Sequence, residues 1–557
     1  MLTLCHCDVI VSLYMGYYKL GCTWGSGGPD FYELLKKHSI VIINKLTVKA
    51  GDVVAVAQGF KVVAIAQVIG ELTPCTAREE LEEVFTDKEI DYEEDTFIAD
   101  AKIWELAPTE QFDYRNRLGQ CQIKKGKTQQ NIHQLLSKMM DEKIVSDCVR
   151  LLRGNYNLVL TGAPGTGKTY LAKRMAELMG ATSKDQVQLV QFHPSYDYTD
   201  FVEGLRPVEK DGELGFRRQD GVFKEFCRKA YKMVSPAGFE EVFRQLSDDI
   251  KNGSLTKVEL KGGQFAKLQV VTENSLKAIP ASQSDSNRAS ESSYSITFDK
   301  LNELYDQYKT LAEFENASTV SESITNVIGD DFKSYYWAVF RLLLQRKERP
   351  YVFIIDEINR GEISKIFGEL FFSIDGNYRG EAGKVKTQYQ NLVPEDDVFY
   401  NGFFIPENVY IIGTINDIDR GVESIDFAMR RRFAWKEITV ESQQFMLDGG
   451  KDDVAWNGQK PSATEIEELK VRMNHLNACI IDEYKGNDKE IPSRERIGLT
   501  KAYQIGAAYF LKYQLYKNFD DLWTYHLDGL LREYLRGTPD IEVKMKRLRE
   551  AYNDTTR

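Results

Sequence analysis

The fold of this chain is indicated by one stretch, Gly162-Ala163-Pro164-Gly165-Thr166-Gly167-Lys168-Thr169, which matches the pattern G-x-x-x-x-G-K-[ST] in full. The apolar segment Leu158-Val159-Leu160 precedes it, and a helical segment that opens with Tyr170 follows it. A strand, a glycine-rich loop and a helix in this order bind phosphates, because backbone N–H groups and the helix start face the anion. We therefore expect the loop and Tyr170 to bind nucleotide, Lys168 to reach its β- and γ-phosphates, and Thr169 to ligate Mg²⁺.

Three further apolar segments indicate the other strands of a parallel sheet. They are Val187–Phe192, Tyr351–Ile355 and Val409–Ile415, and helical segments alternate with them. The second segment is followed by the adjacent acids Asp356 and Glu357. Two acids at the end of a buried strand place a metal ion and a water molecule side by side. Asp356 is therefore the expected Mg²⁺ ligand, and Glu357 is the group expected to polarise the attacking water.

Two polar features follow the last of these strands. Asn416 stands at its end, where a polar side chain can hold the attacking water or the γ-phosphate. Further on, Ala428-Met429-Arg430-Arg431-Arg432-Phe433 ends a predicted helix with three arginines. In an oligomeric nucleotidase such arginines reach the γ-phosphate bound by a neighbouring subunit, which makes Arg431 and Arg432 candidate arginine fingers. A solvated face, or a complement to the helix dipole, is the alternative interpretation.

Length and charge set limits on the function. A chain of 557 residues predicts roughly three to five domains of about 100–200 residues each. With 42% hydrophobic and 28% charged residues, it has the composition of a folded protein. The net charge of −12 excludes coating of nucleic acid by bulk charge, so DNA contact requires a local basic patch. The same charge excludes a polybasic membrane binder.

The cysteines and the apolar stretches indicate a cytoplasmic protein. The eight cysteines are scattered, apart from Cys5-His6-Cys7, whose one-residue spacing is poor for structural zinc. The N-terminus lacks the basic region and the cleavage site of a secretory signal. Polar residues interrupt the apolar stretch Val53–Gly70, which predicts a β-hairpin in place of a membrane span. We expect no metal beyond the ion that a nucleotide brings.

The sequence predicts a multidomain chain around an α/β P-loop core. The expected parts are a β-rich domain at 1–115, a polar linker at 116–135, the first part of the core at 136–233, an insertion at 234–348, the second part of the core at 349–440 and an all-α region at 441–557. The insertion contains a Ser-rich run at 281–295, for which we expect a loop.

Finer predictions concern the insertion and the C-terminal region. In the insertion we expect strands at Lys257–Leu260 and Lys267–Val271 and helices at Leu301–Leu311 and Tyr335–Leu344. In the C-terminal region, apolar residues at helical spacing predict helices at Glu465–Tyr484, Leu499–Tyr516 and Asp520–Leu535.

Two blocks of sequence, about 200 residues in all, resemble the AAA+ motor subunits of modification-dependent (type IV) restriction systems, the McrB family. The first block begins with the P-loop, and the second begins with the strand that ends in the two acids. Their matching runs are Val190–Phe201, Gly204–Pro207, Gly215–Gly221, Phe226-Cys227, Ile354–Arg360, Ile363–Leu370, Arg379–Glu381, Pro406–Tyr410 and Arg432-Phe433.

The resemblance implies a hexameric ring that hydrolyses GTP with Mg²⁺, and a McrC-like partner nuclease that cuts base-modified DNA. The family's loop Met-Asn-Thr-Ala-Asp-Arg corresponds to Ile415-Asn416-Asp417-Ile418-Asp419-Arg420, which adds Asp419 and Arg420 to the candidate catalytic residues. Asp417-Ile418 replaces Thr-Ala in this chain, and the choice between GTP and ATP stays open. Gly506-Ala507-Ala508 lacks the arginine that many AAA+ proteins carry after Gly-Ala.

The N-terminal domain resembles PUA-like folds of the EVE/YTH kind in its Lys49-Ala50-Gly51-Asp52 turn, its hairpin and its Trp104 strand. The resemblance implies a reader that holds a flipped, modified base between aromatic side chains. Trp24 and Trp104 are the candidates, ahead of Tyr32 and Phe60. The alternative is that these aromatic residues belong to the core of a small β domain.

The preferred interpretation is a GTP-hydrolysing motor and specificity subunit that recognises modified DNA, forms a ring and activates a partner nuclease. An ATP-dependent remodelling chaperone of the MoxR type, which shares the core, is the second interpretation. The third is a nucleic-acid-binding module in which nucleotide only drives assembly.

Overall fold

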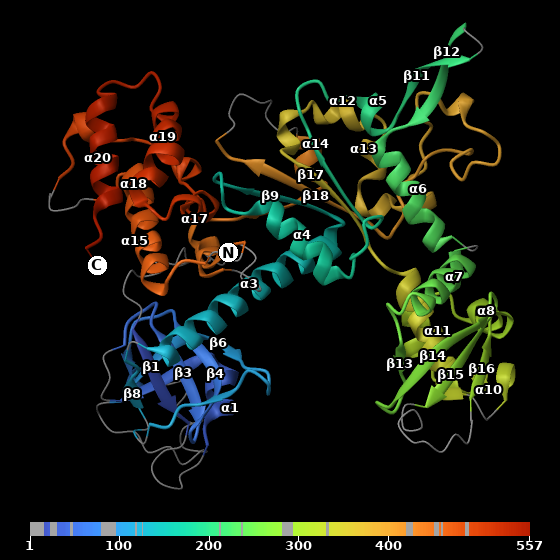
Figure 1. Ribbon diagram of the computed structural model, residues 1–557, viewed down its shortest axis with the longest axis horizontal. Helices are drawn as coiled ribbons and strands as arrows, with labels where there is room; N and C mark the ends of the chain where they lie inside the picture. Colours follow the sequence, from blue (N-terminus) through green and yellow to red (C-terminus); the bar gives the residue numbers. More distant parts are fainter. Residues whose placement is uncertain are drawn as a thin grey trace.

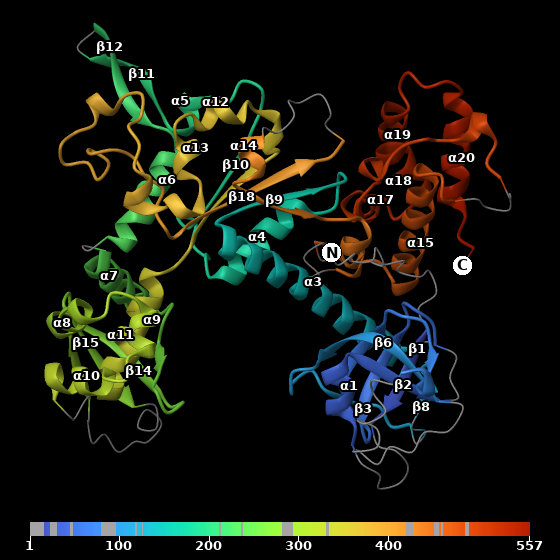
Figure 2. The same ribbon diagram turned by 180° about the vertical axis from the view of Figure 1, so that it is seen from behind.

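The computed structural model describes most of the chain, and every structural statement below concerns the described residues. These are 16–22, 30–44, 48–78, 96–116, 118, 120–124, 126–210, 213–235, 238–280, 293–329, 333–418, 427–449, 456–457, 460–484 and 490–556. Trp24, Asp419 and Arg420 lie outside them, as do residues 281–292 of the Ser-rich run. In Figures 1 and 2 the N-terminal domain and the insertion stand on opposite sides of the core.

The N-terminal domain is a mixed sheet, drawn in blue in Figure 1. Its strands follow the order β2-β6-β4-β3-β1-β8, with β1 parallel to β3 and short strands β5 and β7 at β6 and β4. The elements are β1 (Tyr17–Gly21), α1 (Tyr32–His38), β2 (Ile40–Asn44), β3 (Val53–Gln58), β4 (Lys61–Val68), β5 (Thr73–Pro74), η1 (Cys75–Ala77), β6 (Thr96–Glu105), β7 (Phe112–Asp113) and β8 (Gln120–Gln122). The expected hairpin is confirmed by the antiparallel pair β3–β4.

The expected linker at 116–135 is wrong in part, since its residues belong to regular elements. β8 completes the sheet, and α3 (Lys127–Asn155) begins at residue 127. The polar composition hid two apolar residues one helical turn apart, Ile132 and Leu136, which are buried against the N-terminal sheet. Further along α3, Cys148 and Leu152 are buried against the core. The helix therefore joins the two domains through packing on both.

The core is a five-stranded parallel sheet in the order β10-β17-β18-β9-β19. Its strands are β10 (Val187–Gln191), β17 (Tyr351–Asp356), β18 (Val409–Asn416), β9 (Asn157–Gly162) and β19 (Ala434–Glu437). The four expected strands are thereby confirmed, and β19 is an addition. Both faces of the sheet are buried: Leu158 and Leu160 pack toward α3 and α4 (Lys168–Met179), whereas Val159 belongs to the hydrophobic cluster of the other face.

A two-stranded hairpin projects from the core, as Figure 1 shows. It follows α5 (Tyr198–Phe201) and pairs β11 (Glu203–Lys210) with β12 (Glu213–Asp220). At its base the buried carboxylate of Glu203 accepts hydrogen bonds from Lys224, 2.7 Å away on α6 (Val222–Val234), and from Arg218 at 2.9 Å. This buried ionic cluster fixes the hairpin to the core.

The insertion forms a lobe of its own around a four-stranded antiparallel sheet in the order β13-β14-β15-β16. Its elements are α7 (Gly238–Lys251), β13 (Lys257–Glu259), β14 (Phe265–Thr272), β15 (Ser275–Pro280), β16 (Tyr294–Thr297), α8 (Phe298–Gln307), α9 (Leu311–Asn316), α10 (Val320–Ile328) and α11 (Lys333–Lys347). The expected strands and the helix expected at Tyr335–Leu344 are confirmed, whereas the helix expected at Leu301–Leu311 ends at Gln307. The lobe shares one continuous hydrophobic cluster with the core, so it is not an independent appendage.

The described residues beyond β19 form helices and turns, without a strand. The elements are η8 (Glu441–Asp448), α15 (Ala463–Ile480), η10 (Ser493–Glu495), η11 (Lys501–Tyr503), α16 (Ala507–Phe510), α17 (Tyr513–Tyr516), α18 (Phe519–Leu522), the π-helix η12 (Trp523–Leu527), α19 (Asp528–Tyr534) and α20 (Ile541–Asn553). The helix expected at Leu499–Tyr516 is wrong, since this segment is three short pieces. It breaks at Gly506, whose backbone is extended and whose N–H bonds to the P-loop instead of to a helix.

Within the part of the chain that the structure describes, no helix is both long enough and apolar enough to cross a membrane.

Candidate active site

The predicted site residues come together at the carboxyl edge of the core sheet. In the register of the parallel strands, Asn416 of β18 stands beside Gly162 of β9, and Gly413 stands beside Ile355 of β17. The carboxyl ends of β9, β17 and β18 therefore meet at one edge, as in other open α/β sheets that bind ligands.

The P-loop has the backbone that its glycines predict. Gly165 and Gly167 have φ angles of 78° and 76°, in the left-handed region that favours glycine. Gly162 has a φ of 145°, and a Cβ there would stand 2.2 Å from the carbonyl oxygen of Ile438. Helix α4 begins directly after Gly167, so its free N–H groups point into the loop. This is a cradle for phosphate.

The side chains of Lys168 and Thr169, at the end of the loop, bond to different partners. Lys168 is buried, and its Nζ donates to the carbonyl oxygens of Gly162 at 3.1 Å and Ala163 at 2.9 Å. The Thr169 hydroxyl donates to Oδ1 of Asp356 at 2.7 Å. The two side chains predicted to ligate Mg²⁺ thus lie within hydrogen-bonding distance of each other, although 187 residues separate them in the chain.

The oxygens around Asp356 fit a magnesium ion. Thr414 of β18 donates a second hydrogen bond to the same Oδ1 at 2.6 Å. Hydroxyl and carboxylate oxygens are hard ligands, and Mg²⁺ takes one or two of them from the protein and the rest from phosphate and water. No group of three or more His, Cys, Asp and Glu side chains among the described residues could hold a metal. A site made from Thr169 and Asp356 therefore suits an ion that arrives with nucleotide.

Glu357 is held by side chains from three separate segments. Asn416 Nδ2 donates to its Oε1 at 3.2 Å, and Gln191 Nε2, at the end of β10, donates to its Oε2 at 2.9 Å. Arg360 Nε lies 3.0 Å from the same Oε2. The backbone N–H of Glu357 donates to the Thr414 hydroxyl at 3.1 Å. The carboxylate is thus fixed beside the strand edge where a γ-phosphate would lie.

Three of these contacts were not predicted from the sequence. Gln191 and Thr414 lie inside apolar strands, and Arg360 follows the acids by a few residues, so neither composition nor spacing marked them. The sequence signal that points to Gln191 and Thr414 is their position: each is a polar residue near the carboxyl end of a core strand.

Asp417 replaces a threonine of the resembling family and lies next to the P-loop. Its backbone N–H donates to the carbonyl oxygen of Gly162 at 3.2 Å. Burial raises the pKa of the Asp417 carboxyl above its ordinary value, while the nearby Lys168 ammonium acts to lower it and Glu437 acts to raise it. A half-buried carboxylate beside the P-loop lysine adds negative charge where the phosphates are expected.

The C-terminal helical region closes over the P-loop. The N–H of Gly506 donates to Pro164 O at 2.9 Å, and the N–H of Ala508 donates to Gly165 O at 3.0 Å. A Cβ on Gly506 would stand 2.2 Å from the carbonyl carbon of Gly165, so only glycine fits there. Tyr509 covers the loop on the same side. The segment that lacks the usual arginine therefore contacts the P-loop through its backbone.

Tyr170 extends the loop into the first turn of α4. Its hydroxyl accepts a hydrogen bond from Arg174 Nη1 at 3.1 Å, and Arg174 is paired with Asp141 of α3 at 3.0 Å. Arg174 thus links the P-loop helix to the helix that leads from the N-terminal domain, and Tyr170 bonds to that arginine.

The candidate arginine fingers lie at the opposite end of the sheet from the P-loop of the same chain. Ala434 of β19 stands beside Leu158, so Arg431 and Arg432 lie at the amino end of β9. Five residue steps along β9 from Asn157 to Gly162 correspond to about 16 Å. Arg431 is exposed, whereas Arg432 is half-buried with its guanidinium 5.5 Å from the ring of Phe371. Both arginines therefore lie at the end of β9 that is remote from the P-loop of the same chain.

The aromatic candidates of the N-terminal domain are spread over different environments. Trp104 is half-buried in the cluster under α3, with Lys143 Nζ 6.0 Å from its ring centroid. Tyr32 is buried and donates its hydroxyl to Glu105 at 3.1 Å. Phe60 is 49% exposed, with Lys19 Nζ 5.7 Å from its ring. The structure does not bring these three rings together, and Trp24 lies outside the described residues.

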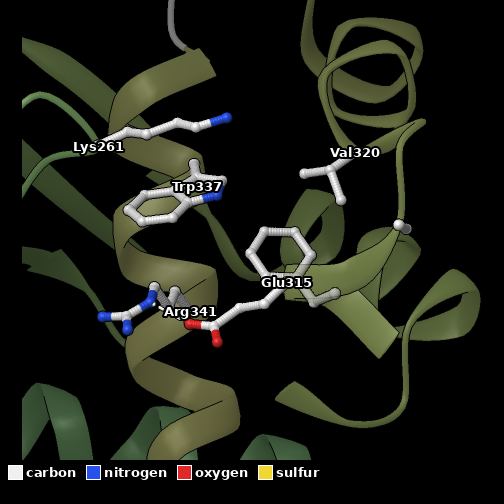
Figure 3. Close-up of a pocket in the computed structure, with 7 residues that line it drawn as sticks. Lys261, Glu315, Val320, Trp337 and Arg341 are labelled. Carbon is white, nitrogen blue, oxygen red and sulfur yellow. Dashed lines mark hydrogen bonds and ion pairs between the residues drawn. The ribbon is translucent and has the colours of Figure 1, made fainter. Parts of the chain in front are cut away.

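The insertion carries a separate pocket of about 270 Å³. Figure 3 shows Trp337 and Arg341 of α11 facing Glu315 and Val320 across it, with Lys261 at its rim. Glu315 is paired with Arg341 at 2.7 Å, so the main charges in the pocket neutralise each other. The pocket lies on the lobe, away from the strand edge that holds the nucleotide-site residues.

Comparisons with known proteins agree with this core. Residues 157–252 and 300–433 match the family of AAA domains of the dynein-related subfamily. The match omits residues 253–299, which include β13 to β16 of the insertion. This part of the chain is therefore similar to an AAA domain, and it carries an added sheet.

Two curated proteins are similar to the chain. The type IV methyl-directed restriction enzyme EcoKMcrB subunit of Escherichia coli (strain K12) is 26% identical over 375 residues, 66% of this chain and 50% of that protein. The type II restriction enzyme BsuMI component YdiS of Bacillus subtilis (strain 168) is 27% identical over 118 residues, 21% of this chain and 34% of that protein. The chain thus spans about half the first relative and about a third of the second.

A solved structure of C. elegans PCH-2 is 12% identical and aligns over 97% of this chain and 98% of that one, with a TM-score of 0.17. Likeness at that level carries no statement about the fold.

Proposed function

We propose that this chain, an AAA+ protein of the McrB type, is the GTP-hydrolysing motor and DNA-specificity subunit of a McrBC-like restriction system. One observation carries the proposal: Thr169, Asp356, Glu357 and Asn416 converge at the end of the P-loop strand. The similarity to a restriction-enzyme subunit supports the kind of system. The N-terminal domain would recognise base-modified DNA, and a McrC-like nuclease would cut it.

The reaction is hydrolysis of the bond between the β- and γ-phosphates. The oxygen of a water molecule forms a bond to the γ-phosphorus as the bridging P–O bond breaks, which leaves a nucleoside diphosphate and inorganic phosphate. Glu357, held by Gln191 and Asn416, would orient that water and accept its proton. Lys168 and the loop N–H groups would bind the phosphates. A magnesium ion on Thr169 and Asp356 would neutralise phosphate charge when bound.

A ring of several copies, by resemblance a hexamer, completes the proposal. Arg431 lies at the end of β9 remote from its own P-loop, which supports a role at a nucleotide bound by another copy. In a ring, this head-to-tail arrangement places an arginine at each site. Arginines that act in this way contribute about 10³–10⁵ in kcat in other nucleotidases.

Steady-state kinetics with GTP and ATP, side by side, test which nucleotide the chain prefers and which class of function it has. We expect a higher kcat/KM for GTP than for ATP. A strong preference for ATP would instead favour the MoxR-type chaperone. The matched control for enzyme contamination is Glu357→Gln, which must lack activity with both nucleotides. A second test adds the partner nuclease and compares cleavage of methylated and unmethylated DNA of the same sequence.

A further inference from the structure

Arg379 is a buried cation that forms no ion pair with the described residues, and its guanidinium lies 5.5 Å from the ring of Tyr156. It is 5% exposed, and its Nη2 donates to Oδ1 of Asn157 at 2.5 Å. Its Nε and Nη1 have no hydrogen-bond partner among the described residues. Burial lowers the pKa of Arg379 to about 10. A buried, incompletely paired charge opposes folding, so stability does not explain why this side chain is an arginine.

Asn157 bonds both to Arg379 and to the turn that carries the three arginines Arg430, Arg431 and Arg432. Its side chain is fully buried at the first position of β9, and Nδ2 donates to the carbonyl oxygens of Arg432 at 2.9 Å and Ile374 at 2.8 Å. The hydrogen bond from Arg379 fixes which way the amide faces, because it requires Oδ1 on the side of the guanidinium. Nδ2 is then directed at the turn that carries the arginines.

The same turn is held on its other side. Trp435 Nε1 donates to the carbonyl oxygen of Arg430 at 3.2 Å, and the Arg430 guanidinium lies 5.2 Å from the Trp435 ring. The carbonyls on both sides of Arg431 are therefore fixed, one by Trp435 and one by Asn157. The flanking Met429 and Phe433 are buried. Arg431 itself is exposed between these two bonded carbonyls.

We propose that Arg379 and Asn157 are positioning residues that fix the turn carrying Arg431, so that Arg431 reaches the γ-phosphate bound by a neighbouring copy of the chain. This inference rests on the proposed function, since it assumes that the arginine acts between copies. It assigns the buried guanidinium to catalysis by the neighbour, not to the site of its own chain or to stability.

The inference is tested with two variants and a mixing experiment on the full chain. Arg379→Met removes the donor to Asn157 together with the buried charge. Asn157→Asp keeps the acceptor for Arg379 but loses the donor to the Arg432 carbonyl. We expect each variant alone to hydrolyse nucleotide about 10- to 100-fold more slowly than the wild type. We expect nucleotide affinity to be unchanged and the Tm to be equal to or higher than that of the wild type.

Each variant is then mixed in equal amounts with Glu357→Gln, which lacks its own reaction but keeps a correctly placed Arg431. Half of the sites keep Glu357, and half of these face an intact arginine, so activity should recover to about a quarter of the wild-type rate. Recovery with both variants, alongside the same recovery for Arg431→Ala, is the expected result.

The other outcomes separate the inference from the proposed function. Wild-type activity of Arg379→Met or Asn157→Asp alone would overturn the inference. A loss that mixing does not repair, when mixing does repair Arg431→Ala, would mean a role within the chain's own site and would also overturn it. If mixing fails to repair Arg431→Ala itself, the arginine does not act between copies, and the proposed arrangement of the ring fails with it. Should Arg379→Met not fold, Asn157→Asp decides the matter, because its carboxylate pairs with the buried guanidinium.

Discussion

The backbone of Glu357 has a φ of 53°, which is uncommon for a residue other than glycine. Such a conformation persists where surrounding contacts fix it, and here Gln191, Asn416, Arg360 and Thr414 do so. The carboxylate is thus oriented before any substrate binds. Orientation of a general base in advance is a large part of its catalytic effect.

Removal of Gln191 therefore affects turnover more than binding. Gln191→Ala frees one oxygen of the Glu357 carboxylate, and we expect kcat to fall about tenfold while nucleotide affinity is kept. The matched control is Gln188→Ala on the same strand, because among the described residues the Gln188 side chain bonds only to the neighbouring Leu189 carbonyl. Steady-state kinetics and a nucleotide-binding titration measure both effects. Equal losses for the two variants would contradict the role given to Gln191.

The environment of Asp417 predicts how the stability of the chain depends on pH. Burial raises the pKa of its carboxyl in the folded chain, so the protonated form is favoured by folding. The stabilisation that the protonated Asp417 carboxyl gives the folded chain is fully present below its ordinary pKa of 3.8. It is lost as the pH rises through the higher pKa that the carboxyl has in the folded chain. At pH 7 the charged group thus opposes folding, and Asp417→Asn should raise the Tm. The gain should shrink as the pH is lowered toward 4, and the exposed Asp396→Asn should show no such change.

Among single residues, those that belong to a local sequence motif could be predicted from the sequence. Lys168, Thr169, Asp356, Glu357 and Asn416 stand in or directly after strands with a strong apolar pattern. Gln191 could not be predicted, because its role arises from the pairing of β10 with β17, which no local pattern specifies.

At the scale of elements, the hairpin β11–β12 depends on charges that are buried at its base. Lys224 and Glu203 are both fully buried and 2.7 Å apart. Burial acts to raise the pKa of Glu203, but hydrogen bonds from Lys224 and Thr387 outweigh it and hold that pKa below its ordinary value. Glu203 also accepts a hydrogen bond from the backbone N–H of Tyr389, so it links the hairpin to a distant loop.

Loss of one partner of the Lys224–Glu203 pair should therefore strongly lower the stability of the core. Lys224→Met leaves the buried Glu203 carboxylate with less compensation, which costs about 3–5 kcal/mol in the free energy of unfolding of the core. Lys229→Met on the same helix is the control, since its ammonium is exposed and its nearest carboxylate is 3.4 Å away. Denaturant unfolding of both variants measures the difference. A cost below about 1 kcal/mol for Lys224→Met would contradict the importance of the cluster.

The elements also show where sequence patterns fail. The core strands and the β3–β4 hairpin were predictable, because their apolar runs are long and bounded by turns. Helix α3 was not, since its buried face toward the N-terminal sheet holds few apolar residues in a polar segment. The helix expected over 499–516 breaks at Gly506 because its N–H bonds to the P-loop, a contact that lies far away in sequence.

At the scale of the whole molecule, the candidate arginine fingers Arg431 and Arg432 lie remote from the P-loop of their own chain. The arginine run lies at the amino end of β9, and the P-loop lies at the carboxyl end. The hydrolysis rate per chain should therefore rise with protein concentration as copies assemble. Arg431→Ala should remove most of this rise, about 10³-fold in kcat at saturation. The exposed Arg150→Ala should leave it intact, and a rate independent of concentration in a monomeric wild-type protein would contradict the ring.

The large-scale plan was predictable in outline from the sequence. A change in pattern marked the insertion, and the P-loop marked the core. The sequence did not show that the lobe shares one hydrophobic cluster with the core, because such sharing depends on side chains that meet only after folding.

The most direct test of the central claim is single-turnover hydrolysis of bound nucleotide by the wild type and by Glu357→Gln. We expect the variant to bind nucleotide with a Kd within about threefold of the wild type and to hydrolyse it at least about 100-fold more slowly, since Gln cannot accept the proton from water. The exposed Glu362→Gln, on the same loop, serves as the control and should behave as the wild type. Hydrolysis by Glu357→Gln at the wild-type rate would contradict the account.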